Sequence, residues 1–101
     1  MVQMEKLLAA AIHNEAEDLI LTVGRPPVLR VRGLLENLRT EVLGPEDTVA
    51  LMKSITPEHR RQELQELGST DFGFSYQDKA RFRVGAFRQQ GNICLVLRLI
   101  P

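Results

Sequence analysis

The sequence predicts one domain of mixed α/β class, more narrowly α+β, in which a mainly antiparallel sheet is flanked by helices. Three observations support this prediction. The 101 residues suffice for one modest hydrophobic core. Helical and two-residue apolar periodicities follow one another in the order helix, two or three strands, two helices and three strands. The connections are short, which favours antiparallel neighbours with helices over one face of the sheet.

The first third of the chain predicts one helix and two or three short strands. Apolar residues at helical spacing give residues 4–15 one apolar face. The GRPP turn separates the first two strands, because proline has no amide proton to donate to a ladder. Gly33 then allows a turn into the third strand. The strands are predicted at residues 18–23, 28–32 and 34–38.

Two helices follow in the middle of the chain. Pro45 suits the first helical position, and the two acids after it suit the positive end of the helix. Thr56, followed by another proline, repeats this signal as the N-cap of the second helix. That helix runs to about Leu67, with Leu64 and Leu67 turned inward, and Gly68 ends it.

The last third predicts three strands in a meander. The first strand covers residues 70–77, and residues 79–101 form a hairpin around a QQGN turn. Alternation within the hairpin puts apolar side chains on the helix-facing side of the sheet and arginines on the other. The predicted helix-facing residues are Ala80, Phe82, Val84 and Ala86, and those facing the other way are Arg81, Arg83, Gly85 and Phe87.

The hairpin concentrates positive charge in a chain that carries none overall. It holds Lys79 and four arginines without a single acidic residue. The whole chain has thirteen cationic and thirteen acidic residues, which gives no support to general nucleic-acid binding. Ten of the thirteen cations are arginines, whose rigid fork of donors suits phosphates and carboxylates. The hairpin is therefore either a solvated edge or a surface that faces something negative.

Other reactive residues give little sign of chemistry. Cys94 is the only cysteine and lies in an apolar run, so we expect it to pack as a small hydrophobe. With His13 and His59 it is too scattered to suggest a zinc site. We interpret Asp18 and Asp71 as strand-edge or turn residues rather than an acid pair.

Enzyme motifs and targeting signals are likewise not found in the sequence. It has no GxxxxGK[ST] phosphate loop, no GxGxxG, no nucleophile elbow and no HExxH. No apolar stretch approaches the roughly 20 residues of a membrane span, and the first residues lack a signal-peptide pattern. We therefore expect a cytosolic module that is not an enzyme by itself.

Four ordered segments resemble the secretion ATPases, and within them the type IV pilus retraction ATPases of the PilT-like branch. AEDLILTVGRPPVLRVRG at residues 16–33 resembles the family's ASDLHLTVGxPPxxRxxG segment. TDFGF at 70–74 resembles TDFSF, ARFRVGAFRQ at 80–89 resembles ARFRVNAFxQ, and RLIP at 98–101 resembles R-x-I-P. Because the four occur in the same order and spacing over essentially the whole chain, they are more specific together than any one alone.

The resemblance implies a PAS-like N-terminal domain of a homohexameric motor that drives pilus retraction and twitching motility. In such proteins a RecA-like ATPase domain, expected after residue 101, holds ATP and Mg. The implied partners are that ATPase domain, neighbouring subunits and the platform proteins of the inner membrane. The implied location is the cytoplasm, at the inner membrane through the pilus machinery. This domain alone is not expected to hydrolyse ATP.

The resemblance also implies roles for the hairpin arginines. Arg81 and Arg83 match residues that approach the nucleotide phosphates and act as catalytic contacts, and Arg88 and Arg98 are cofactor-binding candidates. Charge develops on phosphate oxygens during transfer, and a positioned guanidinium stabilises it. The alternative is that some of these arginines form only salt bridges, with Asp71, with Asp78 or with a neighbouring subunit.

The sequence departs from the family pattern at two positions, and other interpretations of its function stay open. Ile20 replaces the histidine of DLHL, and Gly85 replaces the asparagine of RVNAF. Both favour a divergent paralogue. The pilus-extension and type II secretion ATPases are alternatives within the family. A free-standing PAS-like module for a ligand or partner is an alternative outside it, and nucleic-acid binding is weaker because Phe87 is the only aromatic beside the arginines.

Overall fold

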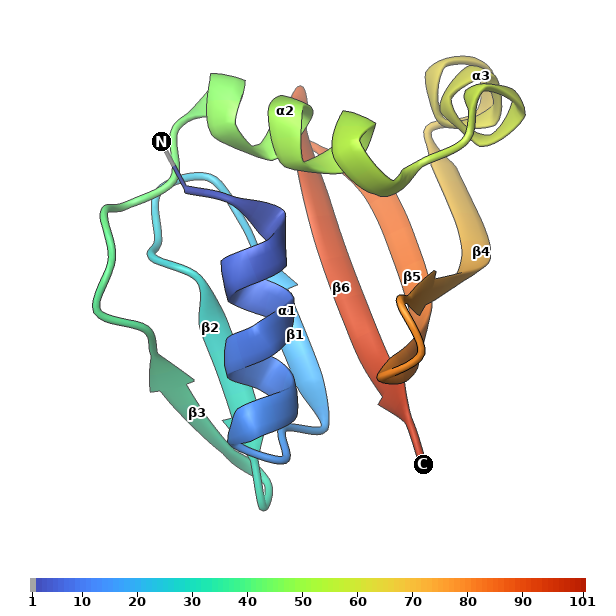
Figure 1. Cartoon of the computed structure of the whole chain (residues 1–101). Helices are drawn as coiled ribbons and strands as arrows, with labels where there is room; N and C mark the ends of the chain where they lie inside the picture. The colour runs from blue at the N-terminus through green and yellow to red at the C-terminus, as the bar shows by residue number, and fades with distance from the viewer. Residues whose placement is uncertain (1) are drawn as a thin grey trace.

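The computed structural model describes residues 2–101 as three helices and one six-stranded sheet (Figure 1). The strand order is β3-β2-β1-β6-β5-β4, and every neighbouring pair is antiparallel. This confirms the predicted α+β class. The elements are α1 (Met4–His13), β1 (Asp18–Leu21), β2 (Val28–Val31), β3 (Leu34–Asn37), α2 (Pro45–Ile55), α3 (Glu58–Leu67), β4 (Ser69–Tyr76), β5 (Ala80–Gln89) and β6 (Asn92–Ile100).

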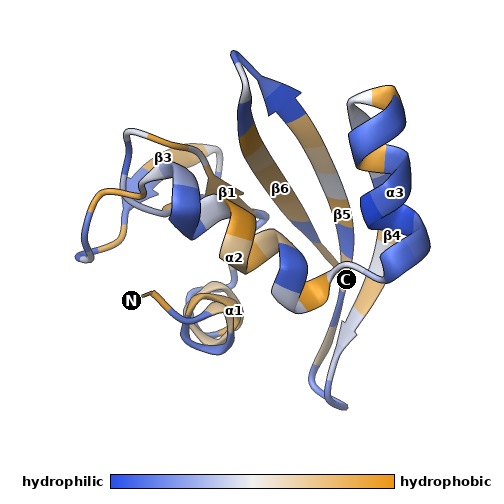
Figure 2. Cartoon of the chain, turned by 90° about the horizontal axis from the view of Figure 1, so that it is seen from above, coloured by the Kyte–Doolittle hydropathy of each residue, from blue (hydrophilic) through white to orange (hydrophobic). Residues whose placement is uncertain are grey.

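The core lies between one face of the sheet and the helices α1 and α2 (Figure 1). Leu8 of α1 and Leu51 of α2 pack against sheet residues that are fully shielded from water. Burying such side chains is the main favourable term in folding. The mostly hydrophilic α3 lies beside β4 and β5 (Figure 2). The most buried sheet residues on this face are Leu19, Leu21, Leu29, Phe82, Val84, Leu95 and Leu97.

The other face of the sheet carries a different set of side chains, and we call it the open face. In the part of the chain that the structure describes, no helix lies over it (Figures 1 and 2). Alternation along the strands assigns side chains to it. The open-face residues used below are Asp18, Ile20, Arg30, Asp71, Gly73, Ser75, Arg81, Arg83, Gly85, Val96 and Arg98.

The predicted start of α3 was wrong by one residue. Thr56 is not its N-cap, because the Thr56 amide donates to the Met52 carbonyl and so ends α2. The Pro57 carbonyl instead accepts the first bonds of α3, from the amides of Arg60 and Arg61. The Thr56 hydroxyl is left buried without a hydrogen-bond partner.

The end of α3 was predicted correctly, but one of its inward residues was not. Gly68 ends the helix in a left-handed conformation with φ of 84°, which glycine adopts without steric cost. Leu64 is buried, whereas Leu67 is 74% exposed. Because α3 packs beside β4, the edge strand of the sheet, only part of its circumference finds a partner.

The remaining boundaries agree with the predicted ones to within two residues. The largest differences are at the end of α1, which stops at His13 rather than residue 15, and of β1, which stops at Leu21 rather than residue 23. No helix among residues 2–101 is long and apolar enough to cross a lipid bilayer.

Candidate functional site

The hairpin arginines lie on two different faces of the sheet. In the β5–β6 register Arg83 stands opposite Arg98, and both belong to the open face with Arg81. Arg88 stands opposite Ile93, a buried residue of the helix-covered face. Since side chains alternate along a strand, an odd separation of five residues turns Arg88 away from Arg83. The four predicted arginines therefore do not form one cluster.

A buried carboxylate organises the open face. Asp18 is only 4% exposed, although it lies on the face without helices. Its Oδ2 accepts a hydrogen bond from Arg30 Nε at 3.1 Å, and its Oδ1 accepts one from Arg98 Nε at 3.1 Å. A desolvated carboxylate is stable in a fold only when its oxygens are engaged in this way. Asp18 is the first residue of β1, in agreement with its interpretation as a strand-edge residue, but its burial and its two arginine partners were not expected.

The Asp18 contacts follow from the sheet register. Asp18 of β1 stands directly opposite Arg30 of β2 on one side and Arg98 of β6 on the other. The row continues through Arg83 of β5. Hydrogen bonding to Asp18 raises the pKa of Arg98 above its usual value. Arg98 is thus an ion-pairing arginine, although with Asp18 rather than with Asp71 or Asp78.

Arg81 and Arg83 differ from Arg98 in having no acidic partner. Both are exposed, and neither forms an ion pair with any residue in the described range 2–101. Arg83 also stands beside Arg98, and like charges on opposite strand positions repel. These two guanidinium groups are consequently available to an external anion, which would relieve that repulsion.

The two departures from the family pattern lie in one row of the open face. Ile20 of β1 and Gly85 of β5 both stand opposite Val96, from its two sides. Asp71 of β4 stands opposite Gly85, and a Cβ built at residue 85 would lie 3.3 Å from Asp71 Oδ1. The Asp71 carboxylate therefore lies over Gly85. Two strands separate Asp71 from Asp18, so the two acids do not form a pair.

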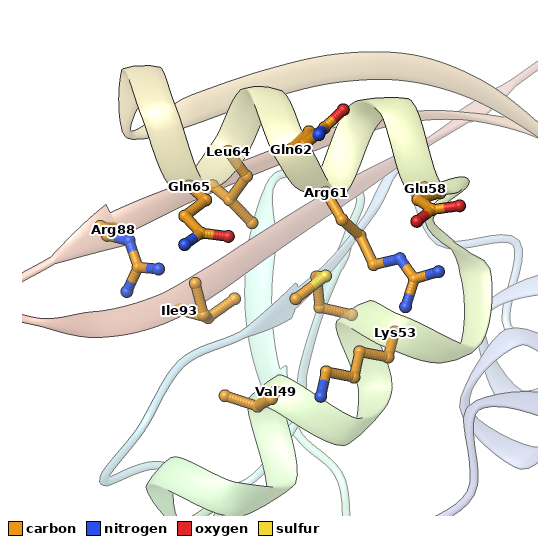
Figure 3. A pocket seen from close by; sticks show the side chains of 10 residues that line it. Val49, Lys53, Glu58, Arg61, Gln62, Leu64, Gln65, Arg88 and Ile93 are labelled. Carbon is orange, nitrogen blue, oxygen red and sulfur yellow. The ribbon is translucent and has the colours of Figure 1, made fainter.

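Arg88 lines a pocket of about 510 Å³ between α2, α3 and the ends of β5 and β6 (Figure 3). Two further cations line it, Lys53 from α2 and Arg61 from α3, together with one acid, Glu58. The Arg88 amide donates to the Gly68 carbonyl at 3.0 Å, which fixes the strand against the end of α3. The sequence offered no sign of this pocket, because Arg88 is far along the chain from Lys53 and Arg61.

A small polar cluster joins α3 to β4. Glu63 Oε1 accepts a hydrogen bond from Thr70 Oγ1 at 2.6 Å and one from Arg60 Nη1 at 3.0 Å. These contacts, with that of Thr70 the largest, lower the pKa of Glu63 below its usual value of 4.5. The cluster holds together two consecutive elements, and we assign it a structural role.

Cys94 is buried, as expected of a small hydrophobe, and its burial raises the pKa of its thiol. Within residues 2–101, no three histidine, cysteine or acidic side chains gather closely enough to hold a metal ion. Nucleotide-phosphate contact by Arg81, Arg83, Arg88 or Arg98 stays a prediction.

Comparisons with known proteins point to one group of ATPases. No family model matches the chain. The type IV pilus retraction ATPase PilT of Pseudomonas aeruginosa is 35% identical over 100 residues, which is 99% of this chain and 29% of that protein. The type IV pilus ATPase PilU of the same organism is 32% identical over 98% of this chain and 26% of its own length.

Solved structures agree with these relatives. A crystal structure of the pilus retraction motor PilT with bound ADP superposes with a TM-score of 0.93 and 36% identity, covering 100% of this chain and 30% of that one. The DotB ATPase of Legionella pneumophila gives a TM-score of 0.81 with 25% identity, over 97% and 28% of the two chains. The chain spans less than a third of the length of these proteins. In sequence and in fold, it corresponds to the N-terminal domain of the PilT-like secretion ATPases.

Proposed function

We propose that the chain is the N-terminal coupling domain of a hexameric secretion-family ATPase that powers type IV pilus retraction. The observation that carries this proposal is that the whole of this chain matches part of a retraction motor, with a TM-score of 0.93 and 36% identity. The ATPase domain would come from the rest of such a protein, since the chain spans only 30% of that motor. ATP and Mg would be held there, and platform proteins at the inner membrane would receive the mechanical work.

Arg81 and Arg83 supply the coupling in this proposal. Their guanidinium groups are exposed on a rigid sheet and have no acidic partner in the described part of the chain. A domain movement that brings them to the nucleotide would stabilise the charge that develops on the phosphate oxygens. The same movement, reversed after hydrolysis, would withdraw them and link turnover to motion.

Arg98 has a positioning role in the same scheme. It is held by Asp18 and stands opposite Arg83, so in this proposal its charge disfavours an approach of the Arg83 guanidinium to Asp18. Only three positions separate Arg98 from Pro101, after which this proposal places the following domain. The Asp18 contact therefore fixes the geometry at the point of connection between the two domains.

Two measurements test this function in order. The first is the gene sequence beyond the codon for Pro101, where the proposal predicts a GxxxxGK[ST] phosphate loop. A stop codon at that point would rule the motor out. The second is ATP turnover of the full-length protein with Arg83→Ala, compared with Arg39→Ala, which removes an exposed loop arginine. We expect Arg83→Ala to lower kcat by at least about tenfold and Arg39→Ala to leave it unchanged.

A further inference from the structure

The pocket that contains Arg88 gathers positive charge without neutralising it. Lys53, Arg61 and Arg88 line it from three different elements, and Glu58 is its single acid. None of the three cations forms an ion pair with another residue of the described chain. Figure 3 shows Lys53 and Arg61 extending into the space between α2 and α3, while Arg88 enters from the strand side.

Arg61 provides a second, independent sign of an absent ligand. Its Nε is buried and has no hydrogen-bond partner in the protein. A buried donor without an acceptor costs free energy, and folded proteins rarely keep one without an external partner. Its neighbour Arg60 donates to Glu63, so the two adjacent arginines of α3 differ in this respect.

The pocket is held in place by the backbone around it. The Arg88 amide is bonded to the Gly68 carbonyl, at the end of the helix that carries Arg61. Only Thr56 and Pro57 separate α2 from α3, which restricts how far Lys53 can move from Arg61. The three cations are therefore presented together by a fixed framework rather than by flexible loops.

We infer that this pocket binds a phosphate-bearing small molecule, with the phosphate between Arg61, Arg88 and Lys53. Arginine forks match the oxygens of a phosphate, and lysine adds a point charge. The volume of about 510 Å³ is that of a small-molecule site. Buried Leu64 and Ile93 form an apolar floor, which would take the uncharged part of the ligand and strengthen the ionic contacts.

This site does not depend on the proposed motor function. It lies on the helix-covered side of the sheet, and the nucleotide contact proposed above uses Arg81 and Arg83 on the open face. The two can therefore fail separately. A motor without a ligand in the pocket would still need Arg83, and a ligand-binding module without an ATPase domain would still need Arg61.

The direct test is a nitrogen-15 NMR titration of the 101-residue chain. The probes are inorganic phosphate, pyrophosphate and ATP, each added at constant ionic strength against chloride. We expect saturable shifts of the Arg61 Nε–H signal and of the Arg88 and Ile93 amides with at least one probe. Saturation by inorganic phosphate identifies a free oxyanion as sufficient, and saturation by ATP alone identifies a nucleotide. Failure of all three probes to shift these signals would overturn the inference, as would shifts confined to the open face.

Matched variants separate a specific site from general attraction of the anion to positive side chains. Arg88→Gln removes an exposed charge from the pocket, so we expect a folded protein with affinity weakened by roughly tenfold or more. Arg61→Gln should weaken it similarly, and because this variant lacks the Nε–H group, its affinity is followed by the Arg88 and Ile93 amides. Arg39→Gln removes the same charge from a distant loop and should leave the affinity within about twofold. Equal weakening by Arg39→Gln and Arg88→Gln would contradict a specific pocket.

Discussion

The open face and the Arg88 pocket both collect arginines, but they manage the charge differently. On the open face the sheet register sets the spacing, and the buried Asp18 engages two of the arginines. In the pocket the cations come from three elements, and one of them keeps a buried donor without a partner. The open face thus combines a structural pair of arginines with two available cations, whereas the pocket has the features of a site whose ligand is external.

The largest expected effect is a loss of stability when the buried carboxylate of Asp18 is removed. Asp18→Asn removes the charge that holds Arg30 and Arg98, and leaves a buried amide whose NH₂ group faces an arginine. We expect the free energy of unfolding to fall by about 1–3 kcal/mol, measured by urea denaturation. Asp71→Asn, an exposed acid of the same face, should change it by less than about 0.5 kcal/mol. Equal effects of the two variants would show that Asp18 is not the organising carboxylate.

Removing the Arg61 guanidinium from the pocket should affect the free energy of unfolding in the opposite direction. Arg61→Met removes the unpartnered buried Nε and keeps an apolar stem of similar length. Without ligand, we expect the free energy of unfolding to stay constant or to rise by up to about 1 kcal/mol. Arg60→Met, which loses the bond to Glu63, should instead lower it by about 0.3 kcal/mol. A loss above about 1 kcal/mol for Arg61→Met would mean that the Arg61 donor is satisfied in solution.

A smaller, pH-dependent effect is expected where α3 meets β4. The pKa of Glu63 is lowered first by Thr70 and then by Arg60, so its charge contributes stability above its unfolded pKa near 4.5. That contribution is lost as the pH falls through the lowered folded pKa. Thr70→Val should move the Glu63 pKa back towards 4.5, as followed by carboxyl carbon NMR. An unchanged Glu63 titration would contradict the role of the Thr70 hydroxyl.

The smallest effect concerns Gly85. The Cβ of Gly85→Ala would meet Asp71 Oδ1 at 3.3 Å, and an exposed side chain can move by the few tenths of an ångström required. The backbone at residue 85 has no positive φ, so alanine is sterically allowed. We expect a change in the free energy of unfolding within about 0.5 kcal/mol, measured by urea denaturation. A larger loss would show that Asp71 is held in place over residue 85.

Much of the fold could be predicted because it depends on local signals. Two-residue alternation predicted the faces of β5, and the glycine after Leu67 predicted the end of α3. Leu67 itself was placed wrongly because its exposure depends on the edge position of β4, which no local pattern reports. Leu43 is 1% exposed in the segment before α2 and was not expected in the core, since a loop has no apolar periodicity.

The site was less predictable, because most of its contacts join residues that are far apart in the chain and leave no local signal. The alternation that places Arg81 and Arg83 on one face also turns Arg88 to the other face. The separation of Arg88 from these two arginines could therefore be predicted from the sequence. The Asp18–Arg98 contact joins residues 80 positions apart, and only the register of β1 against β6 brings them together. The Arg88 pocket likewise requires the packing of α2 and α3 against the hairpin.

We propose that the open face, and not the helix-covered face, approaches the nucleotide in the full-length protein. The most direct measurement is the distance from bound Mn·ADP to a spin label, by pulsed electron paramagnetic resonance. Ser75→Cys labels the open face and Ala9→Cys labels the exposed side of α1, while native Cys94 is buried and its thiol has a raised pKa. We predict a shorter distance from Mn²⁺ to the label at residue 75. A shorter distance to the label at residue 9 would contradict the approach of the open face to the nucleotide.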